Sequence, residues 1–268
     1  MLGRLSGLDC LGDRRANPGC GSEPEAMTGV AIVIPMLNEA AGLPRLLRSL
    51  AVLEPPPAEV LAVDDGSADA SVAIVEAAGL PVVWDDIRSR AAAINRGMQE
   101  ATAPIICVLH ADTLLPDDAV AVMRKVLADP GTVLAGFTPL LSGPDQVRWG
   151  TSFHNWIKTW YAPLLFRPQL FMRGVRLLFG DHAMFFRRAD FLAVGGCDPT
   201  LLVMEEADLC IRFHRLGRTR LVNRVVITSD RRVAAQGALR ANWIYFKIGA
   251  RWALGFRKGL ERHYPDVR

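Results

Sequence analysis

The chain has 268 residues, of which 50% are hydrophobic and 22% are charged, so it can bury a sizeable core. This composition excludes a disordered chain, a small disulfide scaffold and a collagen-like repeat. Charged residues interrupt every apolar run before it reaches the roughly 18 residues of a membrane-spanning helix, so we expect a soluble protein. The net charge of +3 hides an asymmetry, because residues 212–268 contain 14 Lys and Arg against 3 acids. This basic block favours an anionic partner.

The cysteines and the N-terminal residues bear on the cellular compartment. No C-x-x-C pair occurs among Cys10, Cys20, Cys107, Cys197 and Cys210. The pattern therefore indicates neither a zinc site nor a disulfide framework, and a cytoplasmic protein is expected. Residues 1–26 lack the apolar stretch of a signal peptide. They are either a disordered tail or the product of a start site placed too far upstream, and one domain is expected over residues 27–268.

Strand and helix patterns alternate from residue 30 onward. The apolar runs expected to form strands are 30–34, 59–63, 81–84 and 105–109. Helix patterns cover residues 43–53 and 90–101, among others. This alternation predicts an α/β fold with a mostly parallel central sheet and helices on both faces. In such a sheet, ligands bind outside the carboxyl ends of the strands.

Polar clusters follow three of the predicted strands, at Asn38-Glu39, Asp64-Asp65 and Asp112. The first strand lacks the glycine-rich turn of a dinucleotide-binding fold, and the chain has no P-loop motif. These absences argue against hydride transfer. What remains is a nucleotide site built from carboxylates, which suit a ribose, a base N–H or a divalent metal ion that carries a diphosphate.

Four motifs carry a family resemblance: Ile34-Pro35-x-x-Asn38-Glu39, Val63-Asp64-Asp65-Gly66-Ser67-x-Asp69, His110-Ala111-Asp112-Thr113 and Glu205-Glu206-x-x-Leu209-x-x-Arg212. In order and spacing they resemble family-2 glycosyltransferases with the GT-A fold, which has a Rossmann-like nucleotide-binding half and an acceptor half. The resemblance covers residues 28–268.

Further motifs resemble a bacterial subgroup labelled arsenosugar-biosynthesis or radical-SAM-associated glycosyltransferases. They are Leu109-His110-Ala111-Asp112-Thr113, Gly180-Asp181-His182-Ala183-Met184-Phe185, Gly195-Gly196, Ser229-x-Arg231-Arg232 and Tyr264-Pro265-Asp266-Val267-Arg268.

The resemblance implies an inverting transfer of a sugar from a nucleoside-diphosphate sugar to a hydroxyl acceptor, assisted by a divalent cation, Mn²⁺ or Mg²⁺. The acceptor is either a small molecule or lipid-linked. Asp112 is the expected metal ligand, and His110 stands where the family usually has the first carboxylate of Asp-x-Asp, which leaves the identity of the metal open. The competing interpretation of Asp112 is a turn or helix cap.

The resemblance also assigns residues to the donor. Those expected to line the donor pocket are Pro35, Glu39, Asp65, Arg90 and Asn95. Arg231 and Arg232 are candidate clamps for the diphosphate, because guanidinium groups match phosphate oxygens. The competing interpretation of these two arginines is a basic surface, and that of Arg90 is a solvated helix residue.

The acceptor hydroxyl needs a base, and Glu205 and Glu206 begin a helix pattern that Gly217 ends. The family has Glu-Asp at this point, with the Asp as base, so the resemblance assigns the base to Glu206. The glutamate side chain is one methylene longer, which shifts the carboxylate unless the backbone compensates. The competing interpretation is that both acids serve only the helix dipole.

The acceptor side is less well defined. The resemblance places Asp181 and His182 near the sugar and acceptor. Trp149 and His154 are further candidates for the acceptor site, and the competing interpretation is that they serve packing. Residues 237–258 form a basic amphipathic pattern. They predict either a helix in the headgroup zone of an anionic membrane, on its inner face, or a helix docked on the core.

No nucleic-acid partner is expected. The competing function is a non-catalytic sugar-nucleotide-binding or regulatory protein, which would have kept the pocket while losing the chemistry at His110 and Glu206.

Overall fold

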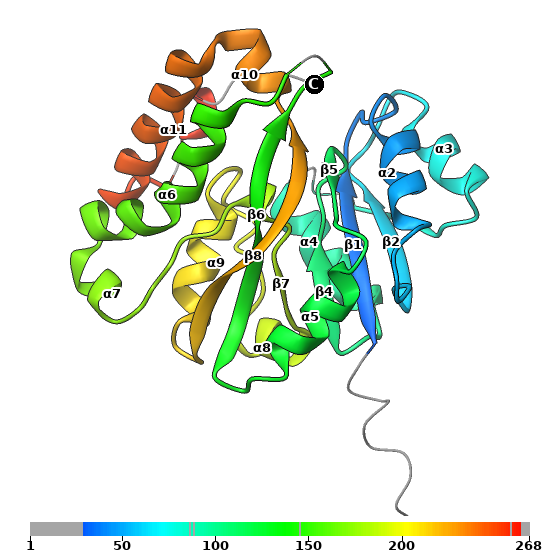
Figure 1. The fold of residues 1–268 in the computed structure, drawn as a ribbon, viewed down its shortest axis with the longest axis horizontal. Helices are drawn as coiled ribbons and strands as arrows, with labels where there is room; N and C mark the ends of the chain where they lie inside the picture. Colours follow the sequence, from blue (N-terminus) through cyan, green and yellow to red (C-terminus); the bar gives the residue numbers. More distant parts are fainter. Residues whose placement is uncertain (1–28, 86, 88, 145, 258, 264–268) are drawn as a thin grey trace, which may run out of the picture.

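The computed structural model describes residues 29–263 except 86, 88, 145 and 258, so the predicted N-terminal tail, 1–26, and the last motif, 264–268, lie outside the described residues. A sheet in the order β3-β2-β1-β4-β7-β6-β8-β5 runs through the molecule (Figure 1). Its strands are β1 (Val30–Met36), β2 (Glu59–Asp64), β3 (Val82–Trp84), β4 (Ile105–Val108), β5 (Thr113–Leu114), β6 (Thr132–Ser142), β7 (Phe185–Arg187) and β8 (Arg218–Ser229).

The pairing confirms the predicted fold class. Strand β1 pairs in parallel with β2 and β4, β2 pairs in parallel with β3, and β6 with β8. Strand β7 is antiparallel to both of its neighbours, β4 and β6, and β5 is antiparallel to β8. The sheet therefore consists of a parallel N-terminal half and a mixed C-terminal half.

Helices follow most strands. They are α2 (Leu43–Leu50), α3 (Ser71–Ala77), α4 (Arg90–Glu100), α5 (Ala119–Leu127), α6 (Trp149–Phe166), α7 (Pro168–Met172), α8 (Arg188–Ala193), α9 (Glu205–Phe213), α10 (Arg231–Gln236) and α11 (Ala238–Ala253). Short 3₁₀ turns lie at Gly180–His182 and Glu261–His263.

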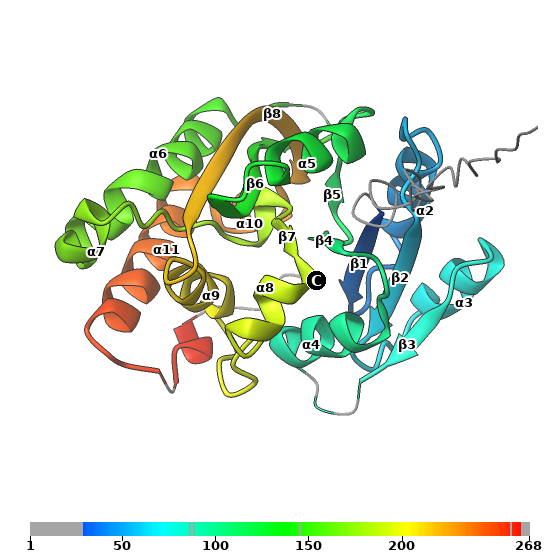
Figure 2. The same ribbon diagram turned by 90° about the horizontal axis from the view of Figure 1, so that it is seen from below.

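The core lies in two layers, one on each face of the sheet. In β1, Ile32 belongs to a core cluster with side chains of α2 and α5 on one face, and Val33 belongs to a cluster with side chains of α4 and α9 on the other. Figure 2 shows α5 on one side of the strands and α4 and α9 on the other. Because β1 is covered on both faces, its sequence is a continuous apolar run instead of an alternating one.

Local signals fix the starts of two helices that carry site residues. The Ser89 hydroxyl accepts a hydrogen bond of 3.1 Å from the Ala92 N–H, so α4 begins at Arg90. Helix α9 begins at Glu205, directly after Met204 in the left-handed region at φ 68°. Arg90, Glu205 and Glu206 therefore all lie in the first turn of a helix.

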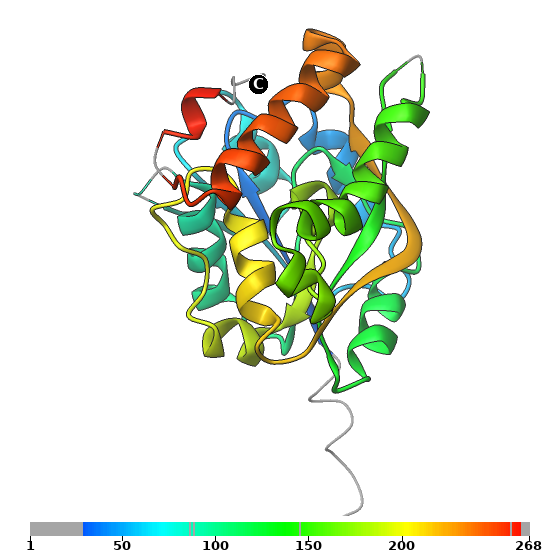
Figure 3. The ribbon, with the colours of Figure 1, turned by 90° about the vertical axis from the view of Figure 1, so that its left-hand side faces the viewer.

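Helix α11 ends at Ala253, so it is shorter than the predicted 237–258 segment. Its inner side docks on the core through Ala241, Ile248 and Trp252, while Leu239 and Trp243 on its outer side are exposed. Figure 3 shows α11 beside α6 on one side of the molecule. Among the described residues, no helix is both long and apolar enough to cross a membrane.

Candidate active site

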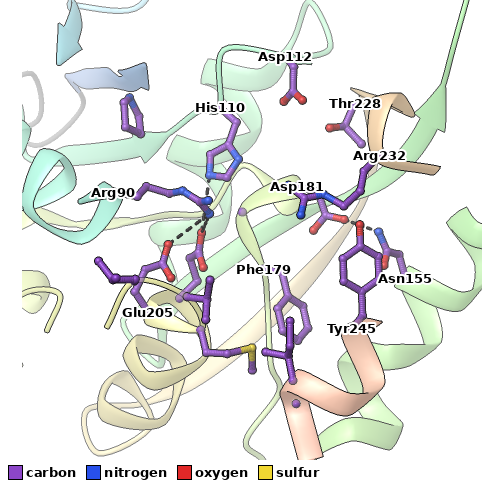
Figure 4. A pocket seen from close by; sticks show the side chains of 18 of the residues that line it. Arg90, His110, Asp112, Asn155, Phe179, Asp181, Glu205, Thr228, Arg232 and Tyr245 are labelled. Carbon is purple, nitrogen blue, oxygen red and sulfur yellow. Dashed lines mark hydrogen bonds and ion pairs between the residues drawn. The ribbon is translucent and has the colours of Figure 1, made fainter. Parts of the chain in front are cut away.

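A pocket of ≈ 470 Å³ lies where the carboxyl ends of β1, β2 and β4 face α6, α9 and α11 (Figure 4). Eleven of the predicted site residues line it: Pro35, Glu39, Asp65, Arg90, His110, Asp112, Asp181, Glu205, Glu206, Arg231 and Arg232. These residues come from both halves of the chain. The pocket is therefore formed by the strand ends of the first half and the helices of the second.

A buried pair of glutamates lies at the centre of the pocket. The Arg90 Nη1 atom is 3.2 Å from Oε1 of Glu205 and 3.2 Å from Oε1 of Glu206. The His110 Nε2 atom is 3.6 Å from the same Glu206 oxygen. Figure 4 shows Arg90 and His110 turned toward the two carboxylates. The arginine and the histidine, both from the first half of the chain, thus hold the start of α9.

The environment separates the protonation states of the two glutamates. Burial, together with the charge of Glu206, raises the pKa of Glu205 well above its usual range. Burial also disfavours ionised Glu206, but the Arg90 guanidinium and His110 outweigh it and hold the pKa of Glu206 low. The surroundings of the pair thus favour the protonated form of Glu205 and the ionised form of Glu206.

Gly180 lies directly against this pair. A Cβ atom at this position would be 2.0 Å from Cε1 of His110 and 2.8 Å from Oε1 of Glu206. Any larger residue would displace the histidine or the carboxylate. The glycine is thus required by the close approach of the backbone to both side chains.

On the opposite side of the pocket, Arg231 connects two acids from the first half of the chain. Its Nη2 atom is 3.0 and 2.9 Å from the two carboxylate oxygens of Glu39 and 3.1 Å from Oδ2 of Asp112. Two carboxylates therefore already face one cation. Asp112 is 27% exposed at the pocket, so its carboxylate remains accessible to a ligand.

Asp112 fits a divalent cation of the kind that nucleotide sites use. Mg²⁺ in such sites is usually held by one or two carboxylates together with substrate phosphates and water. The described residues contain no group of three or more His, Cys, Asp or Glu side chains placed to hold a metal ion. The metal ligands that these residues offer thus suit an ion that binds together with a diphosphate. His110 is turned toward Glu206, and its role as a metal ligand stays a prediction.

Asp64 and Asp65 have different environments although they are neighbours. Asp64 is fully buried, and its Oδ2 accepts hydrogen bonds from the backbone N–H groups of Gly66 and Ser67 at 2.9 and 2.8 Å. It therefore closes the turn after β2. Asp65, in contrast, lines the pocket.

Two predicted contacts differ in the structure. Asn95 does not line the pocket, because its side-chain amide exchanges two hydrogen bonds of 2.8 Å with the backbone of Cys197. The donor contact predicted for it is replaced by a structural role between α4 and the loop before α9. His182 is fully buried behind Asp181, with Nδ1 2.9 Å from the carboxylate, so it orients Asp181 and does not contact an acceptor directly.

The two aromatic candidates on α6 also lie outside the pocket lining. Trp149 is 71% exposed on the outer surface of the molecule. His154 Nε2 is 2.6 Å from the hydroxyl oxygen of Tyr161. Trp149 therefore lies on the other side of α6 from the pocket, whereas His154 reaches the pocket only through Tyr161, which lines it.

The sequence analysis missed Lys158, which α6 directs into the pocket. Its Nζ atom donates a 2.9 Å hydrogen bond to Oδ1 of Asn155 and lies 4.0 Å from the ring centroid of Phe179. Burial lowers the pKa of Lys158, while the charges of Asp181 and Glu206 act in the opposite direction. An ammonium group thus lies between the predicted base and the predicted acceptor residue.

Lys158 is connected to Asp181 through Asn155. The Nδ2 atom of Asn155 donates a short hydrogen bond to Oδ2 of Asp181, and Figure 4 shows both residues close to Tyr245. Sequence did contain one signal for this cluster. Lys158 is the single Lys, Arg, Asp or Glu of the 18-residue helix α6, and a lone charge in an aromatic helix marks a buried polar site.

Comparison with known proteins identifies the family. The family model described as "Glycosyl transferase family 2" matches residues 31–195, which include the ends of β1, β2 and β4 and the glycine at the base of the pocket. The chain belongs to this family.

A curated relative matches part of the chain. The undecaprenyl-phosphate 4-deoxy-4-formamido-L-arabinose transferase of Sodalis glossinidius (strain morsitans) is 33% identical over 115 residues, which make up 39% of this chain. The match covers 35% of the relative's length, so the chain spans only about a third of that protein.

Two solved structures share the fold. The mannosyltransferase PcManGT from Pyrobaculum calidifontis, in complex with GDP-Man and Mn²⁺, superposes with a TM-score of 0.62 at 18% identity and covers 89% of this chain and 65% of its own. Glucosyl-3-phosphoglycerate synthase from Mycobacterium tuberculosis, in complex with Mn²⁺, UDP and glucosyl-3-phosphoglycerate, has a TM-score of 0.56 at 19% identity over 88% of this chain and 83% of its own. At these identities the likeness shows the GT-A fold.

Proposed function

We propose that the chain is an inverting glycosyltransferase that moves a sugar from a nucleoside-diphosphate sugar to a hydroxyl group. The observation that carries the proposal is the carboxylate of Glu206, which lies 3.2 Å from Arg90 and 3.6 Å from His110 in a pocket that residues of the donor motifs also line. Relatives of this family that bind nucleotide sugars and use lipid-linked acceptors support the same assignment.

In the proposed reaction the acceptor oxygen attacks the anomeric carbon of the sugar, and the bond from that carbon to the diphosphate oxygen breaks. The bonding electron pair leaves with the nucleoside diphosphate, and the hydroxyl proton passes to the Glu206 carboxylate. One in-line displacement inverts the anomeric configuration. Glu205, which keeps its own proton, does not compete for the acceptor proton.

Several residues would bind the donor. Asp65, Arg231 and Arg232 line the pocket. We propose that Asp65 binds the nucleoside and that the two arginines bind the diphosphate. We propose that Asp112, with His110 as a further ligand, would hold a divalent cation that binds together with the diphosphate. The bound cation would supply positive charge to the leaving diphosphate. The arginines add to this charge from the chain itself.

The partners that we propose are a nucleoside-diphosphate sugar, a hydroxyl acceptor that is small or lipid-linked, and an anionic membrane contacted through α11. The narrower resemblance, to the arsenosugar-biosynthesis or radical-SAM-associated subgroup, is supported by His110 and Asp181, which belong to its motifs and line the pocket.

The experiment is a release assay with purified protein and Mn²⁺. UDP-glucose, UDP-GlcNAc and GDP-mannose are offered with alcohols from glycerol to geranylgeraniol and with a bacterial lipid extract, and the products are identified by mass spectrometry. Proton NMR of the product gives its anomeric configuration. Inversion supports the proposal, and retention contradicts it. Donor binding without product from any acceptor would favour the alternative, a non-catalytic sugar-nucleotide-binding protein.

A further inference from the structure

The outer surface of α6 and α11 carries an unusual set of exposed apolar side chains. On α6, Trp149, Phe153, Trp156, Trp160 and Leu164 follow one another at intervals of three or four residues. That spacing places them on one face of the helix. Except for the partly buried Trp160, they are among the exposed large hydrophobic residues of the described chain. The pocket lies on the opposite face, where Asn155 and Lys158 point inward.

Helix α11 repeats this pattern. Leu239, Trp243 and Phe246 follow at the same intervals, and the first two are 89% and 64% exposed. The Phe166 and Phe246 ring centroids are 5.7 Å apart, so the two helices are in contact. Figure 3 shows them side by side. We call the eight residues of the two stripes the aromatic platform.

The charge around the aromatic platform has one sign. Residues 147–180 and 231–257, which contain α6, α7, α10 and α11, include no Asp or Glu. On α11, Arg240 and Lys247 each follow a platform residue by one position, and Arg251 lies about one helical turn after Lys247. These three cations therefore flank the stripe. Aromatic side chains beside cations, on helices that contain no acid, match the interface of an anionic bilayer.

We propose that the aromatic platform is a membrane-docking surface for an anionic lipid bilayer, with α6 and α11 lying together in the headgroup zone. This extends to α6 the membrane contact proposed for α11, and it does not require that the chain transfers a sugar. A second copy of the chain is a poorer occupant, because a two-fold interface would bring the cations of both copies face to face. A bilayer with anionic lipids instead attracts every cation around the platform.

The surface also explains two features that the pocket does not use. Trp149 and Trp156, which lie outside the pocket lining, gain apolar surroundings at the acyl-chain boundary. The platform residue Phe246 also lines the pocket. Docking would therefore bring the pocket close to the lipid surface.

The experiment measures flotation of the full chain with phosphatidylcholine vesicles, with and without phosphatidylglycerol, and without nucleotide sugar. Binding should need phosphatidylglycerol and weaken in high salt. Trp156→Gln combined with Trp243→Gln should lower the partition coefficient about tenfold or more, because two interfacial aromatic anchors are lost. The matched control is Trp84→Gln, a tryptophan that is 57% exposed on β3, remote from the platform (Figure 2). This control should bind like the wild type.

Three results would overturn the proposal. One is equal binding with and without phosphatidylglycerol, or no binding to either vesicle. Another is a loss of vesicle binding in Trp84→Gln as large as the loss in the double variant. The third is a dimer, seen by analytical ultracentrifugation, that the double variant dissociates, since the platform would then contact a second copy. Circular dichroism and UDP binding verify that each variant is folded, and neither depends on glycosyl transfer.

Discussion

The wall of the pocket formed by the ends of β1, β2 and β4 consists mainly of polar turns, whereas the wall formed by α6 and α11 is mainly aromatic and aliphatic around one lysine. We call these the donor wall and the acceptor wall. The donor wall is built by neighbouring strands, so its residues occur as short motifs in sequence. The acceptor wall is built by two helices far apart in the chain. On the proposed function, the donor contacts come from turns that the sheet brings together, and the acceptor contacts come from side chains that carry no motif.

The largest effect is expected where the two walls meet, at Glu206. Glu206→Gln keeps the size of the side chain but cannot accept a proton, so the turnover number should fall by about 10²-fold or more while UDP binding holds. Glu205→Gln should cost less, because burial and the charge of Glu206 raise the pKa of Glu205 and so favour its protonated form. Steady-state kinetics measure both.

The reverse order, with Glu205→Gln inactive and Glu206→Gln active, would assign the base to Glu205. Glu206→Asp tests the position of the carboxylate. A faster enzyme would mean that the site retains the geometry of a shorter acid, and a slower one that the backbone has adapted to glutamate.

The donor wall is tested at Asp112. Asp112→Asn removes a charged oxygen ligand, so the Mn²⁺-dependent part of UDP binding should weaken by about tenfold or more. Isothermal titration calorimetry with Mn²⁺ and with EDTA measures it. Asp117→Asn, an exposed aspartate outside the pocket, is the control. Undiminished Mn²⁺-dependent binding in Asp112→Asn would contradict the assignment.

His110→Asp should shift the metal preference of the protein from Mn²⁺ toward Mg²⁺. An unchanged ratio of the activity with Mn²⁺ to the activity with Mg²⁺ would place His110 away from the ion.

Gly180→Ala tests the close approach of the backbone to His110 and Glu206. A Cβ atom there overlaps His110 and Glu206, so Gly180→Ala should lower the free energy of unfolding by about 1–3 kcal/mol. The control is Gly150→Ala, at a helical position with no neighbouring atom within 4 Å, where no loss is expected. Urea unfolding followed by circular dichroism gives both values. Equal stability of the two variants would show that the backbone at Gly180 moves freely.

The smallest effect concerns the acceptor wall. Lys158→Met keeps the length of the side chain but removes the ammonium group between Asp181 and Glu206, so the KM for the acceptor should rise about threefold while UDP binding is unchanged. The control is Lys125→Met, an exposed lysine on α5. If Lys158→Met weakens UDP binding and leaves the acceptor KM unchanged, Lys158 belongs to the donor wall.

The sequence predicted the two walls to different extents, because one is built by neighbouring strands and the other by helices far apart in the chain. The ends of parallel neighbours meet at one edge of a sheet, so Glu39, Asp65 and Asp112 could be placed together from sequence, and the structure has all three in the pocket. Their exact partners could not be predicted. The ion pair between Arg231 and Glu39 joins residues 192 positions apart.

The acceptor wall could not be predicted, because its geometry depends on which face of α6 turns inward. Trp149 and Lys158 lie on opposite faces of this helix, and aromatic residues on both faces hide its amphipathic pattern. Asn95 was placed wrongly for a related reason. Its hydrogen bonds with Cys197 arise from a contact between α4 and a distant loop, and no local pattern indicates such a contact.

The contact of Phe166 with Phe246, two rings that both line the pocket, has a kinetic consequence. If this corner of the pocket meets the bilayer, an acceptor dissolved in the lipid approaches it in two dimensions. The rate of transfer would then saturate with the mole fraction of acceptor within the membrane. Adding inert lipid at a fixed total amount of acceptor would therefore slow the enzyme. A water-borne acceptor would show no such surface dilution, so the vesicles themselves become a way to tell which phase delivers the acceptor.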